Sequence, residues 1–217
     1  AKIDPAIFFK TEMDHRAVLE RYNPSIIDSI KTLTLFSETE ILLLENCTSL
    51  YRKKIKETSA TNLNKEFERL MIELSWKSSQ IEGNTYDLLD TEQLLKYNIQ
   101  SSGNTTEEAT MLLNHKSAIE YSRENAVDYR NISVSKIIDL HSLLIKDMGI
   151  SKTIRKRLVR ITGTKYTPPD NQFIVEEGLD KLCSYINSNS NHYEKALAAV
   201  LLISYLQPFD DGNKRTA

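Results

Sequence analysis

The last twelve residues of the chain hold the side chains best suited to chemistry. An apolar run ends at Leu206, and Pro208 then forces the chain out of a helix, because it lacks a backbone N–H and disfavours helix at Gln207. The segment Asp210 to Asn213 has the composition of a tight turn. If a helix starts near Asn213, backbone N–H groups converge where the helix dipole also favours an anion. We therefore expect a phosphate-binding loop here.

Charged side chains in this segment suit a nucleotide. A carboxylate beside a phosphate repels it unless a cation intervenes, and Asp211 is the hard oxygen ligand that Mg²⁺ takes together with phosphate oxygens. Lys214 and Arg215 add positive charge, and arginine can hold a phosphate with two parallel hydrogen bonds. The spacing alone also fits a solvated loop. The buried helix that leads into it favours a site for magnesium and nucleotide.

The elements that must position this loop are helices. The 217 residues include only 6 Gly and 5 Pro, and apolar residues recur with the helical period through most of the chain. Alternation of period two occurs convincingly only between Leu158 and Tyr166. The sequence predicts a mainly α fold, with helices over these ranges: 37–56, 65–81, 106–123, 133–148, 175–187 and 192–206. The polar stretch 100–106 predicts a boundary between an N-terminal helical region, 1–100, and a core, 101–217.

Composition excludes several classes. Hydrophobic residues at 40% and charged residues at 27% indicate a folded protein. A formal charge of −2 gives no overall attraction to nucleic acid or anionic lipid, so neither partner is expected. No apolar run approaches the ~20 residues of a membrane span. Cys47 and Cys183 have no metal-ligand spacing and are expected to be buried, and the absence of a secretory signal favours the cytoplasm.

The C-terminal segment resembles the signature loop of the Fic family, His-x-Phe-x-(Asp/Glu)-Gly-Asn-(Gly/Lys)-Arg-x-x-Arg. The eight positions from Pro208 to Arg215 fit this pattern without a gap. Family members typically move AMP from ATP onto a hydroxyl of a target protein. The resemblance implies ATP and Mg²⁺ as cofactors, with Asp211 as the metal ligand, and it implies nucleotide binding by four residues: Gly212, Asn213, Lys214 and Arg215.

A second segment resembles the family's inhibitory motif, (Ser/Thr)-x-x-x-Glu-(Gly/Asn). It begins at Ser78 and ends at Glu82-Gly83, after a helix expected over about 65–82. Ser78 and Glu82 are four residues apart and share one helix face. The resemblance implies that Glu82 reaches into the nucleotide site and pairs with the second arginine of the signature. The alternative is a solvated carboxylate at a helix end.

A third segment, Leu158 to Pro169, resembles the β-hairpin flap that lies over the active site in this family. Its edge would pair with the backbone of a target protein and present a Ser, Thr or Tyr hydroxyl. The resemblance therefore implies a Fic-type helical bundle with one small hairpin. The alternative for this segment is an ordinary surface hairpin with no role in binding a target. The implied target-binding residues are Ile161, Thr162, Gly163, Thr164, Lys165 and Tyr166.

The chain departs from the family pattern at the catalytic position. Gln207 stands where the signature has histidine, and an amide can orient a hydroxyl but cannot accept its proton. His141 is a conceivable substitute base, although a lone histidine on an apolar stripe is more often a core residue. The chain ends at Ala217, one position before the second arginine, so the core is expected to be truncated and the partner of Glu82 cannot be identified.

A run of six cations without an acidic residue accompanies the expected flap. Such a run usually forms a solvated face. We expect this one to bind an acidic target or nucleotide phosphates near the flap. Its members are Lys152, Arg155, Lys156, Arg157, Arg160 and Lys165. The sequence as a whole predicts a Fic-type adenylyltransferase, autoinhibited by Glu82 and slowed by Gln207. The alternative is a catalytically silent ATP-binding regulator or sensor. The sequence leaves open which target and which nucleotide the protein uses. It also leaves open the oligomeric state, for which a homodimer is one possibility.

Overall fold

The computed structural model describes residues 4–12, 15–16, 19–161 and 163–217. The mainly α fold is confirmed, because every secondary-structure element of more than one residue in these ranges is a helix. In chain order the helices are α1 (Pro5–Lys10), α2 (Pro24–Ser29), α3 (Glu38–Glu57), α4 (Ala60–Ile81), α5 (Leu88–Tyr97), α6 (Thr106–Glu124), the 3-10 helix η2 (Asp128–Arg130), α7 (Val134–Leu144), α8 (Gln172–Ser188), α9 (His192–Leu206) and α10 (Asn213–Thr216).

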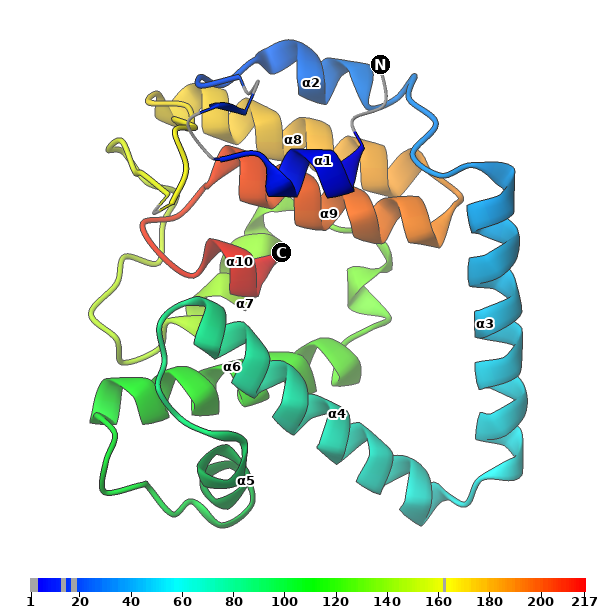
Figure 1. Ribbon diagram of the computed structural model, residues 1–217, viewed down its shortest axis with the longest axis vertical. Coiled ribbons are helices and arrows are strands. Elements are labelled where there is room, and N and C mark those ends of the chain that lie inside the picture. The colour runs from blue at the N-terminus through cyan, green and yellow to red at the C-terminus, as the bar shows by residue number, and fades with distance from the viewer. Residues whose placement is uncertain (1–3, 13–14, 17–18, 162) are drawn as a thin grey trace.

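The helices form two groups with α7 and the short α10 between them (Figure 1). In the first group, α2, α8 and α9 bury the largest apolar cluster, which also takes in Phe209 from the signature loop. In the second, α4, α5 and α6 bury a cluster around Tyr86, Leu94 and Leu112. Helix α7 packs on both α6 and α8, and α10 contacts α7 and α9. The signature loop is therefore held where the two groups meet.

Local capping signals set most helix starts. Ser37 and Glu40 form a capping box at the start of α3, and Thr105 and Glu108 form another at the start of α6. Helix α4 begins at Ala60, five residues before the expected start, because the Ser59 side chain caps it. The expected boundary near 100–106 coincides with the loop between α5 and α6, and the division into 1–100 and 101–217 stays a prediction.

Helix α3 is not buried as its pattern predicted. It runs along one side of the molecule, from the level of α8 and α9 to the start of α4 (Figure 1), and none of its residues is buried. Cys47, which we expected to be buried, is exposed, and so is Tyr51 one turn later, whereas Ile41 and Leu44 are half-buried. The expectation for Cys183 is confirmed, since it is buried in the largest cluster.

The expected β-hairpin is wrong for the described part of the flap segment. Residues 158–161 and 163–166 carry no strand, and the bridge recorded here joins Thr167 to Arg21. The Thr167 amide donates to the Glu20 carbonyl at 2.8 Å, and the Tyr22 amide donates to the Thr167 carbonyl at 3.1 Å. These bonds tie the segment to the N-terminal part of the chain, so it is an anchored loop.

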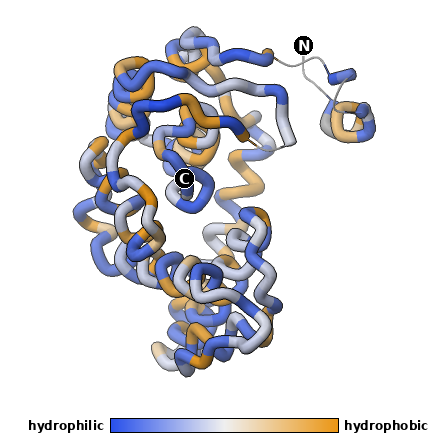
Figure 2. Tube along the Cα trace, turned by 90° about the vertical axis from the view of Figure 1, so that its left-hand side faces the viewer, coloured by the Kyte–Doolittle hydropathy of each residue, from blue (hydrophilic) through white to orange (hydrophobic). Residues whose placement is uncertain are grey.

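Hydropathy follows the packing. Along the helices hydrophobic and hydrophilic residues alternate, as elements with one buried face require (Figure 2). Within the described residues, no helix has both the length and the apolar character that a bilayer span demands.

Candidate functional site

The signature loop begins where α9 ends in a left-handed residue. Gln207 has φ 48° and ψ 62°, and its amide donates to the Ile203 carbonyl at 2.9 Å. The Asn213 side chain then closes the loop, accepting from the Phe209 amide at 2.8 Å and donating to the Phe209 carbonyl at 2.9 Å. Both polar atoms of this buried side chain are thus used within the loop.

His141 supports the loop from α7. Its ring stacks on the fully buried Phe209 ring, with centroids 3.6 Å apart and planes at 5°, and its Nε2 lies 3.0 Å from the Asp211 carbonyl oxygen. Burial lowers the pKa of His141 to about 4, so the ring is neutral at pH 7 and Nε2 is the donor. The side chain is completely buried. His141 is thus a core residue, and it does not replace the missing base.

A tight turn opens α10. Gly212 precedes the helix with φ 74°, a conformation that disfavours a side chain, and an added Cβ would lie 3.4 Å from Ile145. The amides of Asn213, Lys214 and Arg215 lie in the first turn of α10, where a helix provides no acceptor for them. Lys214 is exposed beside them. This is the arrangement of backbone donors that the sequence predicted.

Glu82 is aimed at this turn by the end of α4. The Gly83 amide donates to the Gln80 carbonyl and the Asn84 amide to the Ser79 carbonyl, both at 3.0 Å, with Gly83 at φ 93°. This is a Schellman cap, and Glu82 is its C-cap residue. Ser78 lies half-buried one turn before Glu82 on α4.

The Glu82 carboxylate pairs with Arg215. Glu82 Oε2 lies 2.5 Å from Arg215 Nε, with side-chain exposures of 12% and 0%. Asp211 Oδ2 is a second, longer contact of the same guanidinium, at 3.6 Å from Nη2. Burial outweighs the attraction of Arg215 and raises the pKa of Glu82 above its usual value. Arg215 is the first arginine of the signature. The expected pairing of Glu82 with the second arginine concerns a position after Ala217 and stays a prediction.

The loop after Glu82 is fastened to α6. Asn84 Nδ2 donates to the Glu108 carbonyl at 3.0 Å, and the Glu108 carboxylate accepts from the Thr85 amide at 2.6 Å and from its hydroxyl at 2.7 Å. These hydrogen bonds, with those of the Thr105 cap, lower the pKa of Glu108 to about 2. A charged Glu108 therefore fixes the C-terminal end of α4, and with it the position of Glu82.

All three segments meet in one cavity of about 480 Å³, a size ordinary for a small-molecule site. Its lining residues come from the end of α4, from the flap segment and from the signature loop: Ile81, Glu82, Gly83, Val159, Arg160, Ile161, Gln207, Asp210, Asp211, Asn213 and Lys214. A larger cavity of about 750 Å³ lies between Tyr22, Pro168 and α8, but no residue of the inhibitory or signature segments lines it. The smaller cavity is therefore the candidate functional site, because the charged residues of the inhibitory and signature segments line it.

The expected flap residues lie in different places. Ile161 lines the cavity, Thr162 falls outside the described residues, and the next three, Gly163, Thr164 and Lys165, are exposed and absent from its lining. Tyr166 turns toward α9, where its ring stacks on Tyr205 and its hydroxyl donates to the Tyr205 carbonyl at 2.8 Å. It anchors the loop and is not presented to a target.

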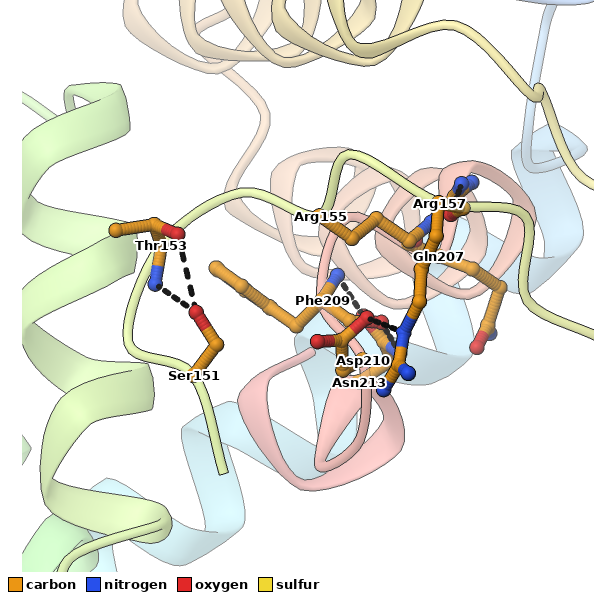
Figure 3. A network of polar contacts seen from close by, with 8 residues as sticks. All are labelled: Ser151, Thr153, Arg155, Arg157, Gln207, Phe209, Asp210 and Asn213. Atoms are coloured by element: carbon orange, nitrogen blue, oxygen red, sulfur yellow. Dashed lines mark hydrogen bonds and ion pairs between the residues drawn. The ribbon is translucent and has the colours of Figure 1, made fainter. Parts of the chain in front are cut away.

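The basic run is not one solvated face, contrary to expectation. Arg155 is 3% exposed and hydrogen-bonds to backbone carbonyls, and Arg160 lines the cavity. Arg157 lies on the outside and pairs through Nε with Asp210 Oδ1 at 3.0 Å (Figure 3). Lys152, Lys156 and Lys165 are exposed, as expected for a solvated face. The sequence held no signal that separated Arg155 from its neighbours.

The Asp211 carboxylate suits a magnesium ion held jointly with a nucleotide. It is 52% exposed, lines the cavity, and accepts from the Gly212 amide at 2.6 Å through Oδ1. The described residues contain no group of three or more His, Cys, Asp or Glu side chains placed to hold a metal by themselves. One carboxylate beside phosphate oxygens is how Mg²⁺ usually binds, so the donor set fits that ion when nucleotide is present.

Part of the chain matches a known family model. Residues 131–217 match the model of the Fic/DOC family. The protein adenylyltransferase fic-1 of Caenorhabditis elegans is 24% identical over 143 residues, covering 63% of this chain and 28% of that protein. The protein adenylyltransferase Fic of Drosophila willistoni is 26% identical over 147 residues, covering 65% and 29%. The matched segment is thus less than a third of either relative.

The fold is also shared. A Fic domain containing signaling protein from Bacteroides thetaiotaomicron has a TM-score of 0.64 at 22% identity, with 79% of this chain and 68% of that chain covered. Residues 131–217 thus match the Fic/DOC family model, and the helical fold of the chain resembles that of a solved Fic domain protein.

Proposed function

We propose that the chain is a protein adenylyltransferase that transfers AMP from Mg-ATP to a Ser, Thr or Tyr hydroxyl of a target protein. The observation that carries this proposal is the single cavity lined by the end of α4, the flap segment and the signature loop. Relatives named protein adenylyltransferase support the reaction class. In the reaction the hydroxyl oxygen bonds to the α-phosphorus, the bond to the β-phosphate breaks, and pyrophosphate leaves.

The turn before α10 holds the triphosphate in this proposal. The first backbone amides of α10 donate to phosphate oxygens, Gly212 lets the backbone approach closely, and Lys214 adds a charge. Asp211 holds Mg²⁺, which when bound neutralises phosphate charge. Arg160 and Ile161 flank the same cavity from the flap segment, where they can contact the target or the nucleotide.

Glu82 keeps this state inactive. In this state the Arg215 guanidinium is fully buried, lies 2.5 Å from the Glu82 carboxylate and does not line the cavity, so it is not presented to a phosphate. Arg215 becomes available only when Glu82 leaves, so removal of the carboxylate activates the protein. Glu82 also lines the cavity, and its negative charge opposes a phosphate there.

Gln207 makes the reaction slow. Its Nε2 donates to the Ser204 carbonyl at 2.8 Å, on its own helix, and the amide accepts no proton at neutral pH. General-base catalysis worth about 10²–10⁴-fold is therefore missing at this position.

Transfer from ATP labelled at the α-phosphate tests the proposal. The full-length protein is compared as wild type, Glu82→Gly, and Glu82→Gly with Gln207→His, with itself and a cell lysate as acceptors. We expect label on protein in the Glu82→Gly form and more in the double variant. Absence of label in both forms, under conditions where each binds Mg-ATP, excludes adenylyl transfer.

The second candidate is an ATP-binding regulator without catalysis. The hydrogen bond of the Gln207 amide to its own helix favours it, because that amide is not poised to act on a hydroxyl. Calorimetric titration separates the two functions. Mg-ATP binding with no label transfer, even after Gln207→His, indicates the regulator.

A further inference from the structure

Arg155 contacts three consecutive carbonyls at the end of α9. Its amide donates to the Pro208 carbonyl at 3.0 Å, its Nε to the Gln207 carbonyl at 2.5 Å, and its Nη2 to the Leu206 carbonyl at 3.2 Å. Carbonyls at a helix C-terminus lack intrahelical donors, and the helix dipole there favours a cation. Figure 3 shows Arg155 beside Gln207 on this turn.

The same guanidinium holds both ends of the flap segment. Nη1 donates to the Arg157 carbonyl at 2.8 Å and Nη2 to the Pro169 carbonyl at 2.6 Å. Residues 157 and 169 bracket the loop that contributes Val159, Arg160 and Ile161 to the cavity. One buried side chain therefore joins the two ends of this loop to the turn that starts the signature.

The turn needs such a tether. A left-handed conformation costs a residue with a side chain roughly 1–2 kcal/mol, and Gln207 adopts it at the point where the signature leaves α9. A planar guanidinium carries five donors in a fixed arrangement, whereas a lysine ammonium carries three on a flexible stem. Only arginine can reach this set of carbonyls from one position.

We propose that Arg155 is a positioning residue that fixes the target-side loop, 157–169, relative to the phosphate-side turn, 206–208. Arg155 contacts neither the target nor the nucleotide. It acts by fixing the position of the loop, one wall of the cavity, relative to the turn, the other wall. This role rests on the proposed adenylyl transfer, in which a hydroxyl from one wall must meet the α-phosphorus held by the other.

Amide hydrogen exchange tests the coupling without any activity. Arg155→Lys keeps the charge and Arg155→Gln removes it, while Arg157→Ala is the matched control, because Arg157 is 76% exposed and pins the same loop from outside. We expect exchange of the Gln207 and Thr167 amides to accelerate together by about 10-fold or more in both Arg155 variants. Arg157→Ala should leave the Gln207 amide unchanged. Acceleration of only one segment, or equal acceleration throughout α4 and α6, overturns the proposal.

Kinetics in the Glu82→Gly form supply the second readout. Misplacement by about 1 Å can cost 10²-fold in rate, so Arg155→Lys should lower kcat for label transfer by roughly 10- to 100-fold. The KM for Mg-ATP should stay within about threefold, because the amides of α10 are untouched. An unchanged kcat contradicts the positioning role. If neither Glu82→Gly nor its double variant with Gln207→His transfers label while binding Mg-ATP, the proposed function fails, and the exchange experiment alone decides the role of Arg155.

Discussion

Replacing Glu82 by alanine should weaken the apo protein and strengthen nucleotide binding. Removing one partner of a buried ion pair costs about 3–5 kcal/mol, and here Arg215 is fully buried. The lower end applies, because Asp211 remains 3.6 Å from the guanidinium and because burial already raises the pKa of Glu82. We expect the free energy of unfolding to fall by about 3 kcal/mol.

Bound phosphate can then take the place of the carboxylate. If about 2 kcal/mol of that loss is recovered by a phosphate oxygen on Arg215, the affinity for Mg-ATP rises about 30-fold. Calorimetric titration measures the affinity, and urea denaturation with and without Mg-ATP measures the stability. Glu73→Ala is the control, because Glu73 lies on the exposed side of α4 and pairs only with Arg69 in the described structure. Equal or weaker affinity in Glu82→Ala would refute the autoinhibitory role.

Three further predictions concern the loop and its base. In the Glu82→Gly form, Gln207→His should raise label transfer by about 10²–10⁴-fold; a rise below threefold contradicts the assignment of position 207. Burial lowers the pKa of His141 to about 4, so the folded state binds fewer protons than the unfolded state between pH 4 and 6.5. Between pH 7 and pH 5 the free energy of unfolding should therefore fall by about 2 kcal/mol more in wild type than in His141→Gln, as measured by urea denaturation. Parallel pH profiles of the two proteins would contradict a buried, neutral His141. Asn213→Ala leaves the Phe209 amide and carbonyl unpaired and should lower the free energy of unfolding by about 2–3 kcal/mol in urea denaturation; a loss below about 1 kcal/mol contradicts the two-bond closure.

Signals carried by a few neighbouring residues predicted much of this molecule. The Ser37–Glu40 capping box and the Gly83-Asn84 cap give the ends of α3 and α4, and Pro208 gives the end of α9. The turn at Gly212 follows from its own residues as well. Each depends on hydrogen bonds that close within about six residues, so the sequence alone is enough.

Contacts between distant segments could not be predicted. Arg155 and Arg157 are alike in sequence, yet one is buried by carbonyls some fifty positions away and the other is exposed. Tyr166 turns to Tyr205, and Thr167 bonds to Glu20, so the alternating pattern that predicts a hairpin yields an anchored loop. These outcomes depend on tertiary packing, which a local pattern does not record.

The partner of Glu82 shows the same limit. The sequence alone does not indicate that Glu82 contacts Arg215, which the structure places 2.5 Å from its carboxylate. This contact depends on where α4 ends, and the Asn84 and Glu108 contacts that fasten that end to α6 join segments more than twenty residues apart.

The most direct test of this account is a crystal structure of the full-length Glu82→Gly protein soaked with Mg-ATP. The account predicts a triphosphate in the cavity of about 480 Å³, with its phosphates on the first amides of α10 and a magnesium ion against Asp211. A nucleotide bound elsewhere, or a cavity without nucleotide at a concentration that saturates binding in solution, would contradict it.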